Sequence, residues 1–315
     1  MRKMKKITDI LGIKYPIIQG GMAWISEAKL AAAVSNAGGA GIISAGGRDA
    51  SYVREQIKIA RSLTNKPFGV NVQLMAPNKD EIVDILCEEK VAFTTLGAGN
   101  PIPYFEKLAK AQVKIIPVVP NVKLAKRVEA AGADAIIVEG MEAGGHIGNL
   151  TTMALMTQVI LAVNAPVVIA GGIADGRGVA AALLMGAAGV QMGTRFLLAD
   201  ECMVHPNVKQ ALIHAIDTDS IVTGQSIGHA VRGIKNKFSL HFVELEKAGV
   251  SEEQLIKLAT GTNKLAAVDG DIENGMILAG QSLLPLVKIE PINDIIQNII
   301  SEANSALEDA KNIKL

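Results

Sequence analysis

The segment IVEGMEAGGHIGNLTTM, residues 137–153, combines residue types that can transfer protons. An apolar run at 135–138 ends on the carboxylate of Glu139, and two glycines then precede His146, before two threonines that can cap a helix. Histidine exchanges protons near neutral pH, and glycine lets the backbone approach a ligand closely. Enzymes built from βα units place such groups at the carboxyl end of a buried parallel strand. We therefore expect His146 to be a catalytic residue in a ligand-binding loop.

Two later glycine clusters indicate a phosphate site. Gly171 and Gly172 follow the apolar run at 167–170, and a Gly–Thr pair follows the run at 189–192. In α/β barrels the loops after the seventh and eighth strands hold phosphate through backbone N–H groups at a helix N-terminus. The glycines could instead serve only to make tight turns, but their presence in both loops favours a phosphate.

Other apolar runs also end in small or amide residues, at 20–22, 45–47, Asn71 and Gly97. A flat ligand lying across the mouth of a barrel needs close backbone approach and a few amides for its ring edges. A phosphate together with such a heterocycle suggests flavin mononucleotide (FMN). The chemistry alone leaves a phosphorylated sugar as an alternative.

The alternation of short apolar runs with helical patterns predicts an α/β fold, a (β/α)8 TIM barrel. The candidate strands are 15–18, 41–44, 68–72, 92–95, 114–118, 135–139, 167–170 and 189–192. The candidate helices among them are 26–37, 50–64, 79–90, 102–111, 122–131, 152–163 and 176–186. An open, doubly wound sheet is the alternative, but eight strand–helix units without an early break favour closure.

The pattern changes after the eighth strand. Helical patterns lie at 207–215, 237–248 and 252–264, without further strand–helix alternation, and the isoleucine-rich segment 294–309 would pack as the last barrel helix. We therefore predict two parts. Residues 1–199 and 291–315 would form an FMN-binding TIM barrel, and residues 200–290 a helical insertion that covers the active-site face.

The composition argues against several classes of protein. Lys plus Arg equals Asp plus Glu at 31 each and aromatic residues are only 3%, so nothing indicates nucleic-acid binding. The cysteines form no CxxC motif and the histidines no HxxxH or HxH motif, so we expect neither a disulfide framework nor a metal site. The first residues lack the apolar core of a secretory signal, and no apolar run is long enough to span a bilayer. We expect a cytoplasmic protein that does not enter the membrane.

Five segments resemble a known family: YPIIQGGMAW, GVNVQLM, EGMEAGGHIG, IAGGIADGRG and QMGTRF. In this order they resemble the flavin-dependent enoyl-acyl-carrier-protein reductase II family, which belongs with the nitronate monooxygenases (2-nitropropane dioxygenase-like proteins). The resemblance runs from Lys6 to about Ser282. The EAGGH motif is shared by both branches, whereas the whole segment EGMEAGGHIGNLTTM, with PVVPNVKLAKR before it, is more similar to the reductase.

The resemblance implies a role for individual residues. His146 matches the family's active-site histidine, and Met276 would lie on the substrate side. The residues it implies for FMN are Gly21, Met22, Ala23, Asn71, Glu139, Gly145, Gly171, Gly172, Gln191, Met192, Gly193 and Thr194. It also implies NADH or NADPH as hydride donor, a monovalent cation, acyl carrier protein as partner, and a homodimer.

Our leading hypothesis is an FMN-dependent NAD(P)H:enoyl-acyl-carrier-protein reductase of bacterial fatty-acid synthesis, with NADH favoured. Hydride would pass from reduced FMN to the β-carbon of a 2-enoyl thioester, and His146 would supply the α-proton. Because the carrier protein is acidic, basic residues near the mouth are candidates to bind it: Arg195, Arg232, Lys235 and Lys237. The alternatives are a nitronate monooxygenase, a flavin-free sugar-phosphate lyase or isomerase, and a non-catalytic module that binds the carrier protein.

Overall fold

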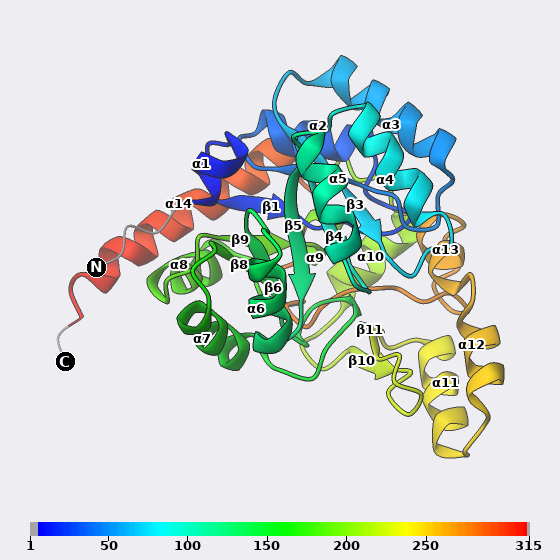
Figure 1. Ribbon diagram of the computed structural model, residues 1–315. Helices are drawn as coiled ribbons and strands as arrows, with labels where there is room; N and C mark the ends of the chain where they lie inside the picture. The colour runs from blue at the N-terminus through cyan, green and yellow to red at the C-terminus, as the bar shows by residue number, and fades with distance from the viewer. Residues whose placement is uncertain (1–5, 314–315) are drawn as a thin grey trace.

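The computed structural model describes residues 6–313, and its centre is a barrel of eight parallel strands (Figure 1). The strands are β1 Ile17–Gln19, β2 Gly41–Ser44, β3 Phe68–Gln73, β4 Phe93–Gly97, β5 Lys114–Val119, β6 Ile136–Glu139, β8 Val167–Ala170 and β9 Gly189–Met192. Their order is β1-β9-β8-β6-β5-β4-β3-β2. A parallel bridge between Ile18 and Ala40 joins β1 to the start of β2. The TIM-barrel prediction is confirmed, and the open sheet is excluded.

The strands are apolar on both faces because one face packs inside the barrel and the other against helices. Ile18, Ile42, Phe93, Ile116 and Ile137 belong to one buried cluster that also contains Ile7 and Leu11 of α1 (Ile7–Leu11). Their sequence neighbours on the strands, such as Ile17, Ile43 and Ile136, belong to the larger cluster with the surrounding helices. The short helix α1 therefore closes the amino-terminal end of the barrel, so that any site must lie at the other end.

Eight helices surround the strands (Figure 1). They are α2 Ala28–Asn36, α3 Ala50–Leu63, α4 Lys79–Glu88, α5 Phe105–Lys110, α6 Val122–Ala130, α7 Thr152–Ala162, α8 Gly176–Leu184 and α14 Ile292–Ala310. The last of these packs against α8 and α2, with Ile292, Ile295, Ile296 and Ile299 buried. This confirms the expected last barrel helix. None of the described helices is both long and apolar enough to cross a membrane.

Residues 200–290 leave and re-enter the barrel at one place, where Ala199 and Glu290 form a parallel bridge. The segment contains the helices α10 Pro206–His214, α11 Lys237–Lys247, α12 Glu252–Ala259 and α13 Thr262–Ala267. The predicted helix 252–264 is divided because Gly261 between α12 and α13 adopts a left-handed conformation, with φ of +83°.

The insertion also contains a hairpin that the sequence analysis did not predict. Its strands β10 (Ser220–Thr223) and β11 (Val231–Ile234) are antiparallel, and β11 pairs with β7 (Gly145–His146). The expected histidine loop is thus partly a strand, in which His146 stands opposite Val231. The insertion therefore fixes the backbone at the position predicted to be catalytic.

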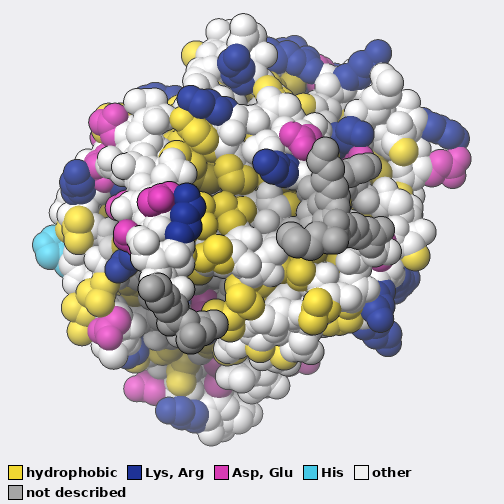
Figure 2. Space-filling model, turned by 90° about the vertical axis from the view of Figure 1, so that its left-hand side faces the viewer, with side chains coloured by type: hydrophobic (Ala, Val, Ile, Leu, Met, Phe, Trp, Pro, Cys, Tyr) yellow, Lys and Arg dark blue, Asp and Glu magenta, His cyan; other side chains and the backbone are white. Residues whose placement is uncertain are grey.

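Figure 2 shows a face that carries α8 and part of α14, on which hydrophobic side chains gather among charged ones. Large apolar side chains are exposed on α7 and at the end of α8, where Leu161 is 88% and Leu184 63% exposed. Contiguous exposed apolar surface is typical of an interaction site.

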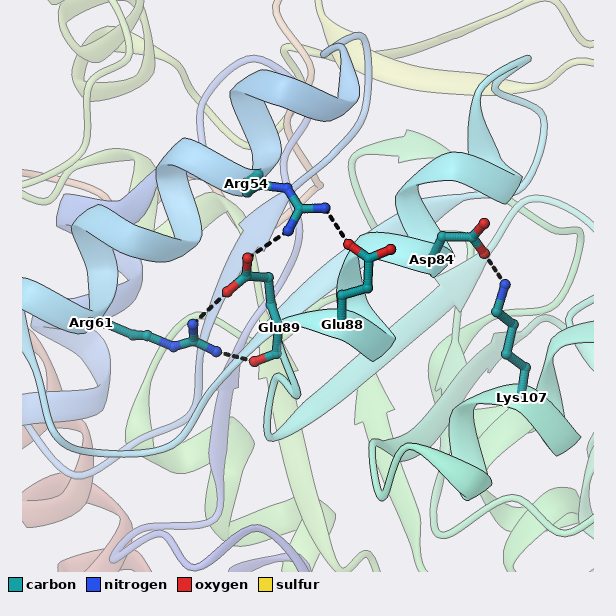
Figure 3. Close-up of polar contacts among 6 residues, drawn as sticks. All are labelled: Arg54, Arg61, Asp84, Glu88, Glu89 and Lys107. Carbon is teal, nitrogen blue, oxygen red and sulfur yellow. Dashed lines mark hydrogen bonds and ion pairs between the residues drawn. The ribbon is translucent and has the colours of Figure 1, made fainter.

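Ion pairs connect the outer surfaces of α3, α4 and α5 (Figure 3). Arg54 binds Glu88 and binds Glu89 at 2.7 Å, Arg61 binds Glu89 at 2.6 Å, and Lys107 binds Asp84. Each exposed pair contributes only about 0–1 kcal/mol. Their effect is mainly to neutralise the basic side chains of this surface.

Candidate active site

A cavity of about 240 Å³ lies at the carboxyl ends of the strands. It is lined by the loops that follow the barrel strands and by Asn263, Leu278, Gly280 and Ser282 of the insertion. The predicted site residues that line it are Gly21, Met22, Ala23, Asn71, Glu139, Gly145, His146, Gly171, Gly172, Gln191, Met192, Gly193 and Thr194. The structure thus brings together residues that are up to 173 positions apart, from Gly21 to Thr194.

One wall of the cavity is backbone. Gly171 and Gly172 both adopt left-handed conformations, with φ of +91° and +75°. The N–H groups of Gly172 and Ile173 after β8, and of Gly193 and Thr194 after β9, make no hydrogen bond within residues 6–313. Free N–H groups converging from two adjacent loops fit an anion such as a phosphate.

Two amide side chains on the cavity wall have unused hydrogen-bonding capacity. Asn71 on β3 donates to Thr95 Oγ1 at 3.0 Å, and no described residue donates to its oxygen. Gln191 on β9 is 8% exposed, and its Oε1 is buried without a partner among the described residues. Because a buried acceptor without a donor is costly, these groups fit a ligand that presents N–H or O–H groups.

Glu139 ends β6 at the cavity, and no described residue forms a hydrogen bond or ion pair with its carboxylate. Burial raises its pKa to about 7. A buried carboxylate without a partner lowers the stability of the folded protein when it is ionised. Carboxyl groups with a raised pKa are therefore found mainly where a function requires them.

His146 faces the open cavity from β7 and is held there by the pairing of β7 with β11. Protein surroundings lower its pKa by desolvation, and nearby His229 lowers it further. The imidazole is therefore largely neutral at pH 7. His229 lies between β10 and β11, in a loop that contains Gly224 and Gly228, and the sequence analysis assigned it no role.

Two residues hold the loop before His146: Glu142, to which the sequence analysis assigned no role, and Arg232, which it assigned to the carrier protein. Glu142 accepts hydrogen bonds from the Thr152 backbone N–H and hydroxyl, each at 2.9 Å. It therefore caps α7, whereas Thr151 at the N-cap position makes no side-chain cap. Arg232 Nε donates to the Met141 carbonyl at 2.8 Å, across the base of the same loop.

The predicted carrier-protein site is only partly accessible. Arg232 is 4% exposed and donates to Met141 and Ser220, and Arg195 is 8% exposed and binds Glu290 at 2.6 Å. Both arginines are engaged inside the protein, so the prediction that they bind a partner is wrong. Lys235 and Lys237 are exposed.

Met276 does not line the cavity. Its side chain is 5% exposed and packs in a small cluster with Phe238, Phe242 and Leu255 of the insertion. Thr223 donates to its sulfur at 3.7 Å. Its expected position beside the substrate therefore stays a prediction, which would require the insertion to move.

The closed barrel and the cavity at the carboxyl ends of its strands define an α/β-barrel protein with the architecture of an enzyme. The sequence matches the nitronate monooxygenase family over residues 4–86 and 78–302, so the chain belongs to this family of FMN-type oxidoreductases.

Relatives within the family have different names. A probable nitronate monooxygenase of Staphylococcus aureus is 34% identical, covering 98% of this chain and 99% of the relative. The structure of FabK from Thermotoga maritima is 44% identical, covers 98% of this chain and 99% of its own, and has a TM-score of 0.95. The structure of the nitroalkane oxidase from Streptomyces ansochromogenes is 29% identical in sequence and has a TM-score of 0.84. The match covers 96% of this chain and 99% of the oxidase chain.

Proposed function

We propose that this protein is an FMN-dependent enoyl-acyl-carrier-protein reductase of bacterial fatty-acid synthesis. The observation that carries the proposal is the likeness to FabK, an enoyl-acyl-carrier-protein reductase, at 44% identity over nearly the whole chain. The relatives named as a nitronate monooxygenase and a nitroalkane oxidase have lower sequence identities to this chain, of 34% and 29%. NADH is the preferred hydride donor in this proposal, with NADPH as the alternative.

The cavity residues fit FMN. The free N–H groups after β8 and β9 would hold its phosphate, through Gly171, Gly172, Gly193 and Thr194, with Gln191 and Met192 beside it. Asn71 and Glu139 would contact its polar groups, and the loops with Gly21, Met22, Ala23 and Gly145 would lie along it. When bound, FMN supplies the hydride chemistry.

In this proposal His146 donates a proton to the substrate. Hydride addition at the β-carbon of an enoyl thioester leaves the α-carbon in need of a proton, and His146 donates it directly or through a water molecule. Because desolvation and His229 lower its pKa, the protonated ring is scarce at pH 7. Proton donation should therefore become faster as the pH falls.

The lowered pKa of His146 favours a second candidate, oxidation of nitroalkanes or their nitronates with FMN and oxygen. A neutral imidazole is ready to accept the proton of a nitroalkane at neutral pH. The family match and the Staphylococcus relative point to the same reaction.

The biological setting of the reductase follows from its substrate. We propose an acyl carrier protein as partner, a cytoplasmic location, and a homodimer that covers the exposed apolar side chains of α7 and α8, such as Leu161 and Leu184. A monovalent cation remains part of the proposal without an assigned site.

Two assays with purified protein test this function. Anaerobic oxidation of NADH or NADPH that depends on crotonyl thioester supports the reductase. Turnover of a nitronate under oxygen, with no thioester-dependent reaction, would replace it by the monooxygenase. A colourless protein that gains no flavin absorbance when FMN is added would exclude both and leave the lyase or isomerase barrel.

A further inference from the structure

A second cavity, of about 460 Å³, adjoins the first. The two cavities share Ala98, Val118, Glu139 and His146 in their linings. From there the second cavity runs between the loop after β4 and helix α6, and Arg127 lies in its wall. A passage therefore connects the candidate catalytic residue to the outer surface of α6.

The wall of this cavity is mainly apolar, with side chains such as Ile102, Val119, Leu124 and Val128. Leu124 and Val128 are four residues apart on α6 and therefore share one face of the helix. Arg127 is exposed, and its guanidinium group makes no ion pair or hydrogen bond within residues 6–313. A slender, largely uncharged ligand with an anionic group at its outer end fits this lining.

The outer surface of α6 carries basic side chains that form no ion pairs with the described residues. Lys123, Lys126 and Arg127 are all exposed, and the structure gives none of them an acidic partner in the described part of the chain. The basic residues of α3 and α5 in Figure 3 are neutralised by carboxylates instead. Since the formal net charge of the protein is zero, the three unpaired basic side chains of α6 are a local excess of positive charge.

We propose that an acidic carrier protein docks on Lys123 and Lys126 of α6 and passes its thioester arm through the second cavity to His146. The inference rests on the proposed reductase function. A carrier-bound thioester sits at the end of a flexible arm whose phosphate lies next to the carrier protein, so that phosphate would meet Arg127. The basic surface and the apolar passage thus match the two ends of one substrate.

This arrangement also explains how a barrel with buried Arg195 and Arg232 can recognise an acidic partner. Charges at the rim of an interface act mainly on the association rate, which electrostatic steering raises by about 10- to 1000-fold. That contribution decreases with salt, because the Debye length falls to about 3 Å at 1 M ionic strength.

The test compares two substrates in the FMN-loaded protein. Crotonyl-acyl carrier protein carries the docking surface and the arm, whereas crotonyl-N-acetylcysteamine carries neither the protein nor the phosphate. In the double variant Lys123→Glu/Lys126→Glu we expect kcat/KM for the carrier-bound substrate to fall at least about 10-fold at low salt. For the small thioester it should change less than about 2-fold, and the carrier-specific loss should shrink in high salt.

A matched control is Lys58→Glu/Lys66→Glu, which changes the net charge equally. Both lysines are exposed and unpaired within the described residues, and neither lines a cavity. In this control variant, kcat/KM should fall by less than about 2-fold with either substrate. An equal loss in both double variants, or no carrier-specific loss in the α6 variant, would overturn the docking site.

A second variant tests the passage itself. Leu124→Trp should narrow the cavity and slow the carrier-bound substrate more than the small thioester. Leu161→Trp, at an exposed position of α7 outside both cavities, should have no such effect. If the reductive half-reaction with NADH slows instead, the passage serves the nicotinamide nucleotide and the proposal is wrong.

Fluorescence anisotropy with labelled carrier protein separates docking from catalysis. If the wild type turns over neither thioester, the reductase function fails, while carrier-protein binding that Lys123→Glu/Lys126→Glu weakens about 10-fold would still support the docking site. A wild type that does not bind the carrier protein would overturn the docking site whatever the assay of turnover shows.

Discussion

The two sides of the active-site cavity are built from different chemical groups. The side formed by the loops after β8 and β9 presents backbone N–H groups at glycines, as at Gly172 and Gly193. The side formed by β6 and β7 presents the titratable side chains of Glu139 and His146, both with shifted pKa values. The first side should therefore bind its ligand independently of pH, and the second should make the chemistry depend on pH.

The largest effect should come from adding a side chain to the backbone side. Gly172→Val adds a branched side chain to the loop that would hold the phosphate, with its Cβ 3.4 Å from the Cβ of Glu142 and at a backbone conformation that L-residues rarely adopt. Both effects should displace the N–H groups of this loop. We expect the purified variant to be nearly colourless. Flavin absorbance of the protein, before and after incubation with FMN, measures this.

Gly132→Val controls for backbone strain in that experiment. Gly132 follows α6, has a φ of +101°, and has open space where a Cβ would lie. The Gly132→Val variant should therefore have comparable backbone strain and yet keep its flavin. Equal loss of colour in both variants would show that backbone strain in general, and not displacement of the phosphate loop, removes the flavin.

The titratable side should give the reaction a pH dependence. Since the pKa of His146 is lowered below 6.5, the protonated imidazole increases as the pH falls through that lowered value. A proton donor then makes the reoxidation of reduced protein by enoyl thioester faster by about 10-fold per pH unit above that pKa. Stopped-flow rates between pH 5 and 8 measure this. A rate that instead rises with pH would assign His146 as a base, as nitroalkane oxidation requires.

A smaller effect concerns the stability of the FMN-free protein. The pKa of Glu139 is about 7 in the folded protein against an ordinary value of 4.5. The unfolded chain therefore loses its proton first, and stability decreases as the pH rises from about 4.5 to 7. Glu139→Gln removes this cost, so it should be about 1–3 kcal/mol more stable than wild type at pH 8, but not at pH 4.

Urea unfolding at the two pH values measures that difference. Glu55→Gln, at an exposed position of α3, is the matched control and should show no such gain. A gain that is equal at pH 4 and pH 8 would mean that packing of the amide, and not ionisation of Glu139, is responsible.

The barrel could be predicted from the sequence because each strand is a short apolar run. Such a run can be recognised without knowing which distant residues it contacts. The bounds of β2, β8 and β9 agree with the predicted ones. Strands buried on both faces have this pattern wherever they lie in the chain. The glycine loops after β8 and β9 could be found for the same reason, since glycine indicates close backbone approach from the sequence alone.

The rest depends on contacts between distant residues. The strand β11 pairs with β7, and Arg232 meets Met141 91 positions away. Arg195 likewise meets Glu290, 95 positions away. Nothing local to β11 or to these arginines reveals such partners, so the hairpin was missed and the arginines were assigned to the surface.

The division of the cavity into a binding side and a reacting side is tested most directly by His146→Ala in anaerobic stopped-flow experiments. The variant should keep its FMN and still be reduced, at least in part, by NAD(P)H, because the N–H groups after β8 and β9 are unchanged. Its reoxidation by enoyl thioester should fall by a factor on the order of 10² to 10⁴. An unimpaired reoxidation would show that His146 has no part in the chemistry, and the cavity would then have no reacting side at β7.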